Sequence, residues 1–201
     1  MLIALNGRIG AGKDTVGAYL VENYGFERWS FAGKLKESFA ALLDVTVEEL
    51  EKWKNDPNWS LSINHGTLPR KRMNFRTALQ RYGTESHRDT FWPDFWVDVL
   101  LPRGVSSEIR YIQEHDVVIT DCRFINEAER IKEYGGMVLE VRRPRPSAEI
   151  HTLGHISENA LPPGTINGII VNDKDFDLLY TRVDKLMNNL GVERRERKDA
   201  V

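Results

Sequence analysis

Residues 7–15 read Gly-Arg-Ile-Gly-Ala-Gly-Lys-Asp-Thr, and this stretch decides the fold. A short apolar run precedes it at 1–6, and residues 13–23 have the pattern of a helix that stops near Gly25. A strand, a glycine-rich loop and a helix together are the context that a phosphate-binding loop of the form G-x-x-x-x-G-K requires. The sequence therefore predicts an α/β fold in which this loop binds a nucleoside triphosphate.

The loop is expected to bind phosphate through its backbone, because glycines leave N–H groups accessible that a Cβ would obstruct. The N-terminus of the following helix adds partial positive charge, and Lys13 can reach the β- and γ-phosphates. Asp14 stands where Ser or Thr usually offers a hydroxyl to Mg²⁺, and we expect its carboxylate to bind that ion directly or through water. The predicted ATP-binding residues are Gly10, Ala11, Gly12, Lys13, Asp14 and Thr15, with Asn172 from a later turn that can lie against the base.

Composition narrows the class of protein. The chain has 201 residues, of which 41% are hydrophobic, and this predicts one domain with a full core. A formal net charge of −2 provides no basic field for nucleic acid, and no apolar stretch approaches the roughly 20 residues of a membrane span. A single cysteine, Cys122, and the absence of a secretory signal predict a cytoplasmic protein. We expect the domain to cover 1–192 and the charged tail at 193–201 to be solvated and frayed.

Apolar runs along the chain predict a doubly wound, five-stranded parallel sheet with helices on both faces. Besides the first strand, strands are expected at 26–31, 116–120, 137–141 and 169–171, and the last helix at 176–190. Two further helices, opening near Ala32 and spanning 93–101, are expected to bury Leu42 and Val99 among their apolar side chains. Thr46 and Glu49 form a capping-box pattern that begins a short charged helix.

Residues 55–72 show little periodicity and are long for a loop in a compact domain. We interpret 44–75 as a mobile flap on the acceptor side, where the molecule that receives a phosphoryl group would bind. Trp53 and Trp59 favour packing or binding within it.

A second loop, at 143–161, follows a strand and reads as a lid whose arginines close over transferring phosphates, with a solvated charged loop as the alternative. Arg143 is the arginine of that lid expected to act on the moving group. His151 and His155 lie in it without a clear third ligand, so no zinc site is expected.

Asp121 and Arg123 follow the buried strand at 116–120, at the edge where doubly wound sheets bind ligands. Asp121 can hold Mg²⁺ through water or accept a hydrogen bond from a substrate hydroxyl; alternatively it caps the helix expected at 124–134. Cys122 reads as a small buried side chain rather than a nucleophile. Arg76 opens a helical segment and could grip phosphate with its forked donors, or be an ordinary surface arginine.

Seven pieces of the sequence stand in the order typical of one family. They are the loop ending Gly12-Lys13-Asp14-Thr15; Ala32-Gly33 with Lys36; Arg76 with Gln80-x-x-Gly83-Thr84-Glu85, then Trp96; Asp121-x-Arg123 with Glu127; Val141-x-Arg143-Pro144; His155-x-Ser157-Glu158; and Asn172-Asp173. Together they resemble the phage-type deoxynucleoside monophosphate kinases of the P-loop NMP kinase superfamily, over almost the whole chain. By this resemblance the monophosphate site would comprise Lys36, Arg76, Gly83, Thr84, Trp96, Asp121, Arg123 and Glu127.

The resemblance implies a three-layer α/β/α kinase that uses Mg²⁺ and transfers the γ-phosphoryl group of ATP to a deoxynucleoside monophosphate for DNA precursor supply. The implied catalytic residues are Lys13, Asp121, Arg123 and Arg143. Two other functions stay open: a P-loop kinase of another small metabolite, and a non-enzymatic ATP-dependent switch. The preferred base, the exclusion of ribose and the oligomeric state, for which a homodimer is one alternative, also stay open.

Overall fold

The apolar run at the start of the chain forms β1 (Leu2–Asn6), whose five residues are all buried. β1 is the middle strand of a parallel sheet with the order β2-β5-β1-β6-β7. The other strands of this sheet are β2 (Glu27–Trp29), β5 (Val117–Ile119), β6 (Met137–Arg142) and β7 (Gly168–Val171). Interior parallel strands are covered on both faces, which is why β5 is apolar throughout and β1 is apolar up to its last residue, Asn6. The predicted five-stranded parallel sheet is confirmed.

The computed structural model describes residues 1–54, 56, 59, 61–63, 71–104, 107–144 and 161–195. The chain divides into two compact units, each with a core of its own. Unit 1 comprises Met1–Ser30 and Leu101–Val201, and unit 2 comprises Phe31–Leu100. No helix in the described part of the chain is long and apolar enough to cross a membrane.

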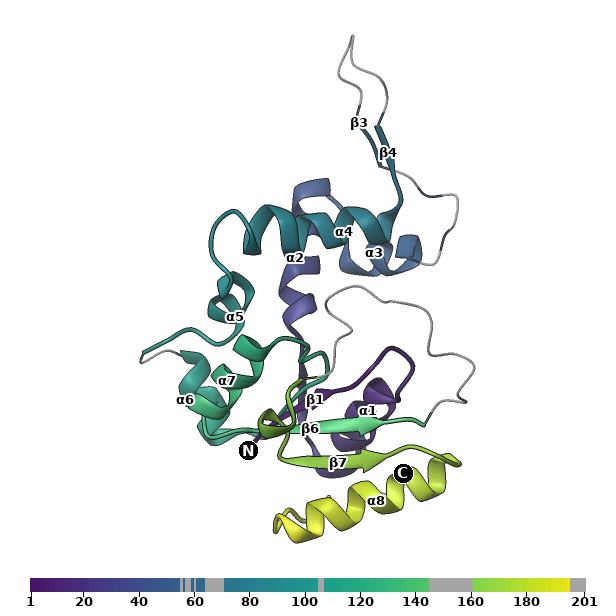
Figure 1. Cartoon of the computed structure of the whole chain (residues 1–201), viewed down its shortest axis with the longest axis vertical. Helices are drawn as coiled ribbons and strands as arrows, with labels where there is room; N and C mark the ends of the chain where they lie inside the picture. Colours follow the sequence, from purple (N-terminus) through teal and green to yellow (C-terminus); the bar gives the residue numbers. More distant parts are fainter. Residues whose placement is uncertain are drawn as a thin grey trace, which may run out of the picture. The chain divides into compact units, whose positions relative to one another are not determined.

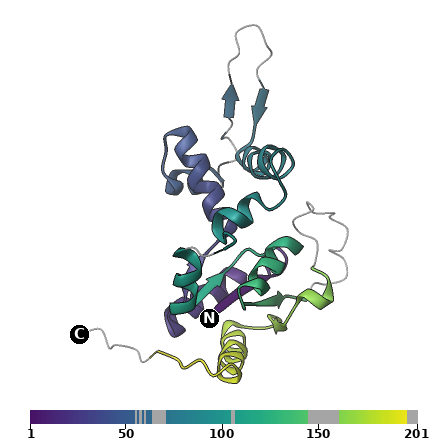
Figure 2. The same cartoon turned by 90° about the vertical axis from the view of Figure 1, so that its left-hand side faces the viewer.

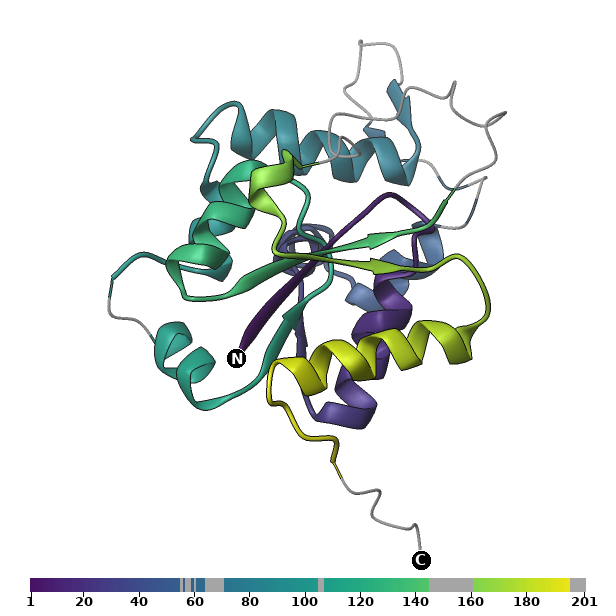
Figure 3. The same cartoon turned by 60° about the horizontal axis from the view of Figure 1, so that its bottom comes forward.

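Unit 1 is built in three layers. α1 (Lys13–Tyr24) and α8 (Phe176–Asn189) lie side by side on one face of the sheet, where they share a core with Ile3 and Leu5 (Figure 3). Neighbouring residues of a strand point to opposite faces, so the equally buried Leu2 and Ala4 need a second cover. α7 (Ile125–Glu133) packs on β1 and β6 and supplies it. The remaining elements of the unit are α6 (Ser107–Glu114) and η4 (Pro163–Thr165).

Helix ends in unit 1 follow the signals in the sequence. Gly25 ends α1 in the left-handed conformation with φ 75°, and Asp175 begins α8 by accepting a hydrogen bond from the amide of Leu178. The tail starts differently from the prediction. Arg194 donates to the Oδ1 atom of Asn23 at 2.6 Å and the amide of Arg195 donates to the carbonyl of Asn23 at 2.8 Å. Its first residues are therefore hydrogen-bonded to α1, not frayed, while 196–201 lie outside the described residues.

Unit 2 is mainly helical, with a core formed by Phe39, Ala40, Leu50, Phe75 and Ala78. Its elements are α2 (Phe31–Leu43), α3 (Val47–Lys54), β3 (Leu61–Ile63), β4 (Lys71–Met73), α4 (Phe75–Gly83), the π-helix η1 (Thr84–Arg88) and α5 (Phe95–Leu100) (Figure 1). The capping box is confirmed: the Oγ1 atom of Thr46 accepts from the amide of Glu49, whose carboxylate accepts from the amide of Thr46.

Three expectations about unit 2 are wrong. The stretch at 55–72 is not loop throughout, because β3 and β4 form an antiparallel pair in and next to it (Figure 2). Leu42 is 66% exposed and Val99 is 44% exposed. Both side chains lie at the margin of an apolar helix stripe, and periodicity alone does not locate the edge of the surface that the stripe contacts. Trp53 and Trp59 do pack, with ring centroids 5.2 Å apart and both near Phe75.

Candidate active site

The loop after β1 holds its glycines in backbone conformations that other residues rarely adopt. Gly7, Gly10 and Gly12 have φ angles of 143°, 75° and 102°. A Cβ on Gly7 would lie 2.4 Å from the carbonyl oxygen of Val141, and one on Gly12 would lie 2.5 Å from the Nδ2 atom of Asn172. The loop therefore packs through its backbone against the ends of β6 and β7, and only glycine fits at these two positions.

Lys13 lies over this loop at the start of α1. Its Nζ atom donates to the carbonyl oxygens of Gly7 at 2.7 Å and Arg8 at 2.9 Å. Gly12 caps the helix without a side-chain acceptor for the first amides, and a phosphate can satisfy such amides. The glycine backbone, the ammonium group and the positive end of the helix fit a polyphosphate.

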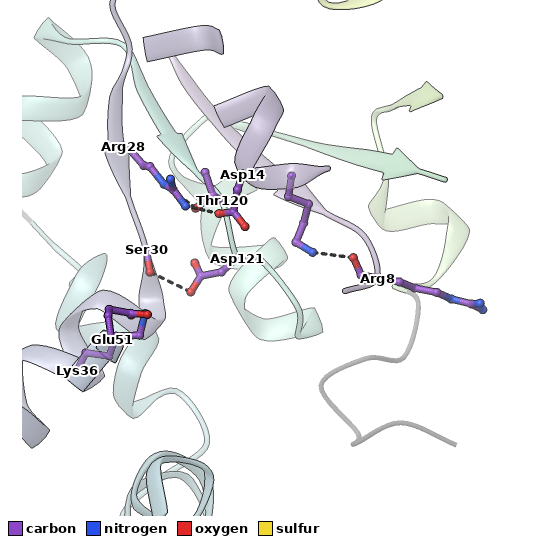
Figure 4. Close-up of polar contacts among 9 residues, drawn as sticks. Arg8, Asp14, Arg28, Ser30, Lys36, Glu51, Thr120 and Asp121 are labelled. Atoms are coloured by element: carbon purple, nitrogen blue, oxygen red, sulfur yellow. Dashed lines mark hydrogen bonds and ion pairs between the residues drawn. The ribbon is translucent and has the colours of Figure 1, made fainter. Parts of the chain in front are cut away.

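Asp14 is bound to a residue that the sequence did not single out. Its carboxylate forms an ion pair with Arg28 of β2, whose Nε atom donates to the Oγ1 atom of buried Thr120 at 3.2 Å (Figure 4). Their positions could have pointed to them, because Arg28 lies in β2, Thr120 directly follows β5, and these two parallel strands are neighbours in the sheet. The Asp14 side chain remains 81% exposed, and a carboxylate suits the oxygen preference of Mg²⁺. Among the described residues, no three His, Cys, Asp or Glu side chains are grouped to hold a metal ion.

Asp121 lies beyond the end of β5 and accepts a hydrogen bond from the Oγ atom of Ser30 at 3.1 Å (Figure 4). The alternative in which Asp121 caps the next helix is wrong, because the N-cap of α7 is Phe124. Cys122 is fully buried, and its burial raises the pKa of the thiol well above the ordinary value. A buried neutral thiol is a poor nucleophile, so the structure confirms Cys122 as a packing residue.

Glu127 organises the turn that carries Arg123. It is buried, and its Oε2 atom accepts hydrogen bonds from the amides of Arg123 at 2.6 Å and Phe124 at 3.0 Å. This carboxylate satisfies amides at the start of α7 and fixes the backbone at Arg123. The side chain of Arg123 is half-buried, on the same turn as Asp121. In the structure, the Glu127 carboxylate thus acts on the protein backbone, by accepting hydrogen bonds from its amides.

Unit 2 carries the other residues assigned to the monophosphate. Lys36 of α2 forms an ion pair with Glu51 of α3 (Figure 4). Arg76 and Gln80 are both exposed on α4, so the predicted helix there is confirmed. Among the described residues, Arg76 has no ion-pair partner.

Gly83, Thr84 and Trp96 join three helical segments of unit 2. The Nε1 atom of buried Trp96 donates to the carbonyl of Gly83 at 2.9 Å, which ties α5 to the end of α4. A Cβ on Gly83 would lie 2.1 Å from the Cδ1 atom of Leu35, so helix α2 approaches closely there. Thr84 is half-buried and begins the π-helix, a feature frequent at functional sites.

The predicted lid at 143–161 is described only at its two ends, where Leu161 is buried. Arg143 is exposed directly after β6, whereas Arg142 pairs with Glu140 at 2.6 Å. Residues 145–160 lie outside the described part of the chain, and with them the predictions for Arg145, His151, His155, Ser157 and Glu158. Most of 55–70 also lies outside it.

The chain is similar to known proteins in sequence and in fold. The family model described as deoxynucleotide monophosphate kinase matches residues 46–183. A putative deoxynucleotide monophosphate kinase of Acanthamoeba polyphaga mimivirus is 28% identical over 94% of this chain and 97% of its own. The deoxynucleotide monophosphate kinase of Escherichia phage RB69 is 28% identical over 56% of this chain and 44% of its own. The solved structure of dephospho-CoA kinase from Campylobacter jejuni superposes with a TM-score of 0.52 at 13% identity, covering 94% and 96% of the two chains, a likeness of fold.

Proposed function

Since the chain belongs to the deoxynucleotide monophosphate kinase family, we propose that it transfers the γ-phosphoryl group of ATP to deoxynucleoside 5′-monophosphates. The products are ADP and the deoxynucleoside diphosphate, and the enzyme would supply DNA precursors in the cytoplasm. The observation that carries the proposal is the match to the family over 46–183. The phosphate-binding loop at 7–15 lies outside that match and is independent support for a nucleotide donor.

On the donor side, Lys13 and the amides of residues 10–15 bind the triphosphate. Lys13 lies over the loop, hydrogen-bonded to its carbonyls, and its proposed role is to stabilise the charge that grows as the γ-phosphoryl group moves. Arg143, exposed after β6, is the lid arginine available to stabilise the same charge. Phosphoryl transfer needs positioning and charge stabilisation rather than a covalent intermediate, and these residues supply both.

Asp14 is the proposed ligand of Mg²⁺, directly or through water, with Asp121 as a second carboxylate acting through water or on a substrate hydroxyl. Both are hard oxygen donors, and Mg²⁺ in such sites is held by one or two carboxylates together with the substrate phosphates. When bound, the ion neutralises charge on the phosphates. Asp14→Asn should therefore raise the Mg²⁺ requirement more than it raises the KM for the acceptor, and equal metal titrations for both proteins would contradict this role.

On the acceptor side, Arg76 and Arg123 are the proposed ligands of the monophosphate. Arg76 is exposed and lacks an ion-pair partner among the described residues, and Glu127 holds the backbone of Arg123. Guanidinium groups bind a dianionic phosphate bidentately, whereas lysine supplies a point charge. Lys36, Gly83, Thr84 and Trp96 complete the proposed acceptor set. For Lys36 this role requires sharing or leaving its pair with Glu51.

The test is an ADP-release assay with ATP and Mg²⁺ against all deoxy- and ribonucleoside monophosphates, on the wild type and on Arg76→Lys and Arg123→Lys. Each variant should cut transfer at least tenfold, about 1.4 kcal/mol, while ATP affinity without acceptor stays nearly unchanged. Arg110→Lys, on the exposed face of α6, is the matched control. If the protein turns over ATP without using any nucleoside monophosphate as acceptor, the proposed function is overturned. If the variants transfer phosphate as fast as the wild type, or lose ATP binding, the assignment of Arg76 and Arg123 to the acceptor is overturned.

A further inference from the structure

Asn172 contacts the phosphate-binding loop through its side chain from a distant part of the chain. It follows β7 and is 7% exposed, and its Nδ2 atom donates to the carbonyl oxygen of Ala11 at 2.9 Å. The same atom occupies the space that a Cβ on Gly12 would need. The side chain therefore fills the gap between β7 and the loop.

The backbone of Asn172 is held as firmly as its side chain. Its amide donates to the carbonyl of Arg142 at 2.8 Å, at the end of β6. The preceding residue of β6, Val141, is the one whose carbonyl oxygen would meet a Cβ on Gly7. The end of the sheet thus contacts the loop at both of its outer glycines, Gly7 and Gly12, and Asn172 is the contact that uses a side-chain hydrogen bond.

The hydrogen bond to Ala11 also sets the direction of a backbone amide. The C=O of Ala11 and the N–H of Gly12 belong to one trans peptide unit, so they point in opposite directions. When Asn172 holds the carbonyl, the N–H of Gly12 is turned away from Asn172. Within the described part of the chain that N–H has no acceptor, as expected of an amide that serves an anion.

We propose that Asn172 is a positioning residue that orients the Ala11–Gly12 peptide for the triphosphate of the donor, and that it does not act through the base. The sequence instead predicted that Asn172 contacts the base of ATP, and the two roles differ in which part of the ligand they favour. A base contact favours ATP over any ligand that lacks a base. A positioning role favours the phosphate chain alone. The inference rests on the proposed function only in requiring that the loop bind a triphosphate.

The test compares two ligands without any acceptor: ATP and inorganic tripolyphosphate, titrated by calorimetry into the wild type, Asn172→Ala and Asn172→Leu. The first variant removes the donor and its volume, and the second keeps a similar volume without a donor. Asn188→Ala, which removes an amide from the exposed surface of α8, is the matched control. Melting temperatures show that each variant is folded at the titration temperature.

We expect both Asn172 variants to weaken ATP and tripolyphosphate by the same factor, at least fivefold, and the control to leave both affinities unchanged. Loss of ATP affinity with tripolyphosphate binding intact would overturn the proposal in favour of a base contact. Wild-type affinity for both ligands would overturn it as well. Failure of the kinase assay on every nucleoside monophosphate would refute the proposed function without touching this result, because no acceptor is present here.

Discussion

At the scale of single residues, the phosphate-binding loop depends on glycine for two separate reasons. Gly7 combines a φ of 143° with a backbone oxygen 2.4 Å from where its Cβ would be. Gly10 has a φ of 75°, but among the described residues no atom other than those of Gly10 and its chain neighbours lies within 4 Å of where its Cβ would be. The first glycine therefore excludes a side chain by conformation and by space, and the second by conformation alone.

Gly7→Ala should consequently be more damaging than Gly10→Ala. A Cβ against the carbonyl of Val141 cannot be relieved by rotating a side chain, so we expect a loss of stability of about 2 kcal/mol or more, against about 1 kcal/mol for the strained φ at Gly10. Urea unfolding of both variants measures the difference. Equal unfolding midpoints would mean that the close approach of the loop to β6 is not a feature of the folded protein in solution.

At the scale of elements, α1 and α8 are joined by a half-buried polar contact. The hydroxyls of Tyr19 and Tyr24 both donate to the Oδ1 atom of Asp184, at 2.8 and 2.7 Å. Burial, followed by the hydrogen bond to Asp184, raises the pKa of Tyr19 to about 12. The same two causes raise the pKa of Tyr24. Both phenols are therefore kept protonated by the packing of the two helices.

This contact predicts a loss of stability at alkaline pH. A tyrosine in the unfolded chain loses its proton near pH 10, whereas Tyr19 in the folded protein keeps it to about 12, so the unfolded state binds fewer protons in this window. The contribution of Tyr19 to the free energy of unfolding is complete below pH 10 and is lost as the pH rises through 12. We expect the free energy of unfolding to fall less steeply above pH 10 in a Tyr19→Phe/Tyr24→Phe variant, measured by urea titration. Parallel pH profiles for the two proteins would contradict the assignment.

At the scale of the whole molecule, ligand binding and folding are coupled. A ligand that binds only the folded state at 100 times its Kd stabilises it by about 2.7 kcal/mol, which for a chain of this size raises Tm by roughly 5 to 10 °C. Tripolyphosphate or ATP should produce this shift in the wild type.

Lys13→Ala should abolish the shift while the Tm without ligand changes little, because the Nζ atom of the lysine donates to carbonyls of the loop rather than to a core element. Phosphoryl transfer should fall more than tenfold in the same variant. A variant that keeps both the thermal shift and more than about a tenth of the activity would overturn the donor-site assignment.

Local sequence patterns predicted much of the fold of this protein. The glycines and Lys13 predicted the loop, because a strand, a loop and a helix that follow one another need only short-range signals. All five parallel strands were predicted: burial on both faces leaves a continuous apolar run at β1 and β5, whereas β2 is largely exposed and carries no such run. The order of the motifs identified the family, which is confirmed, and the family decides among the three functions that the residues alone left open.

The tertiary structure decided which polar groups meet. Asp14 pairs with Arg28, Lys36 pairs with Glu51, and Asn172 reaches Ala11 across 161 positions of sequence. No periodicity encodes such contacts, because they depend on which strand ends and helix faces the fold brings together. The same reason explains why Leu42 is exposed although its helix is amphipathic. The sequence by itself determined the chemistry of the loop, and only the packing of β6 and β7 against it decided how that loop is held.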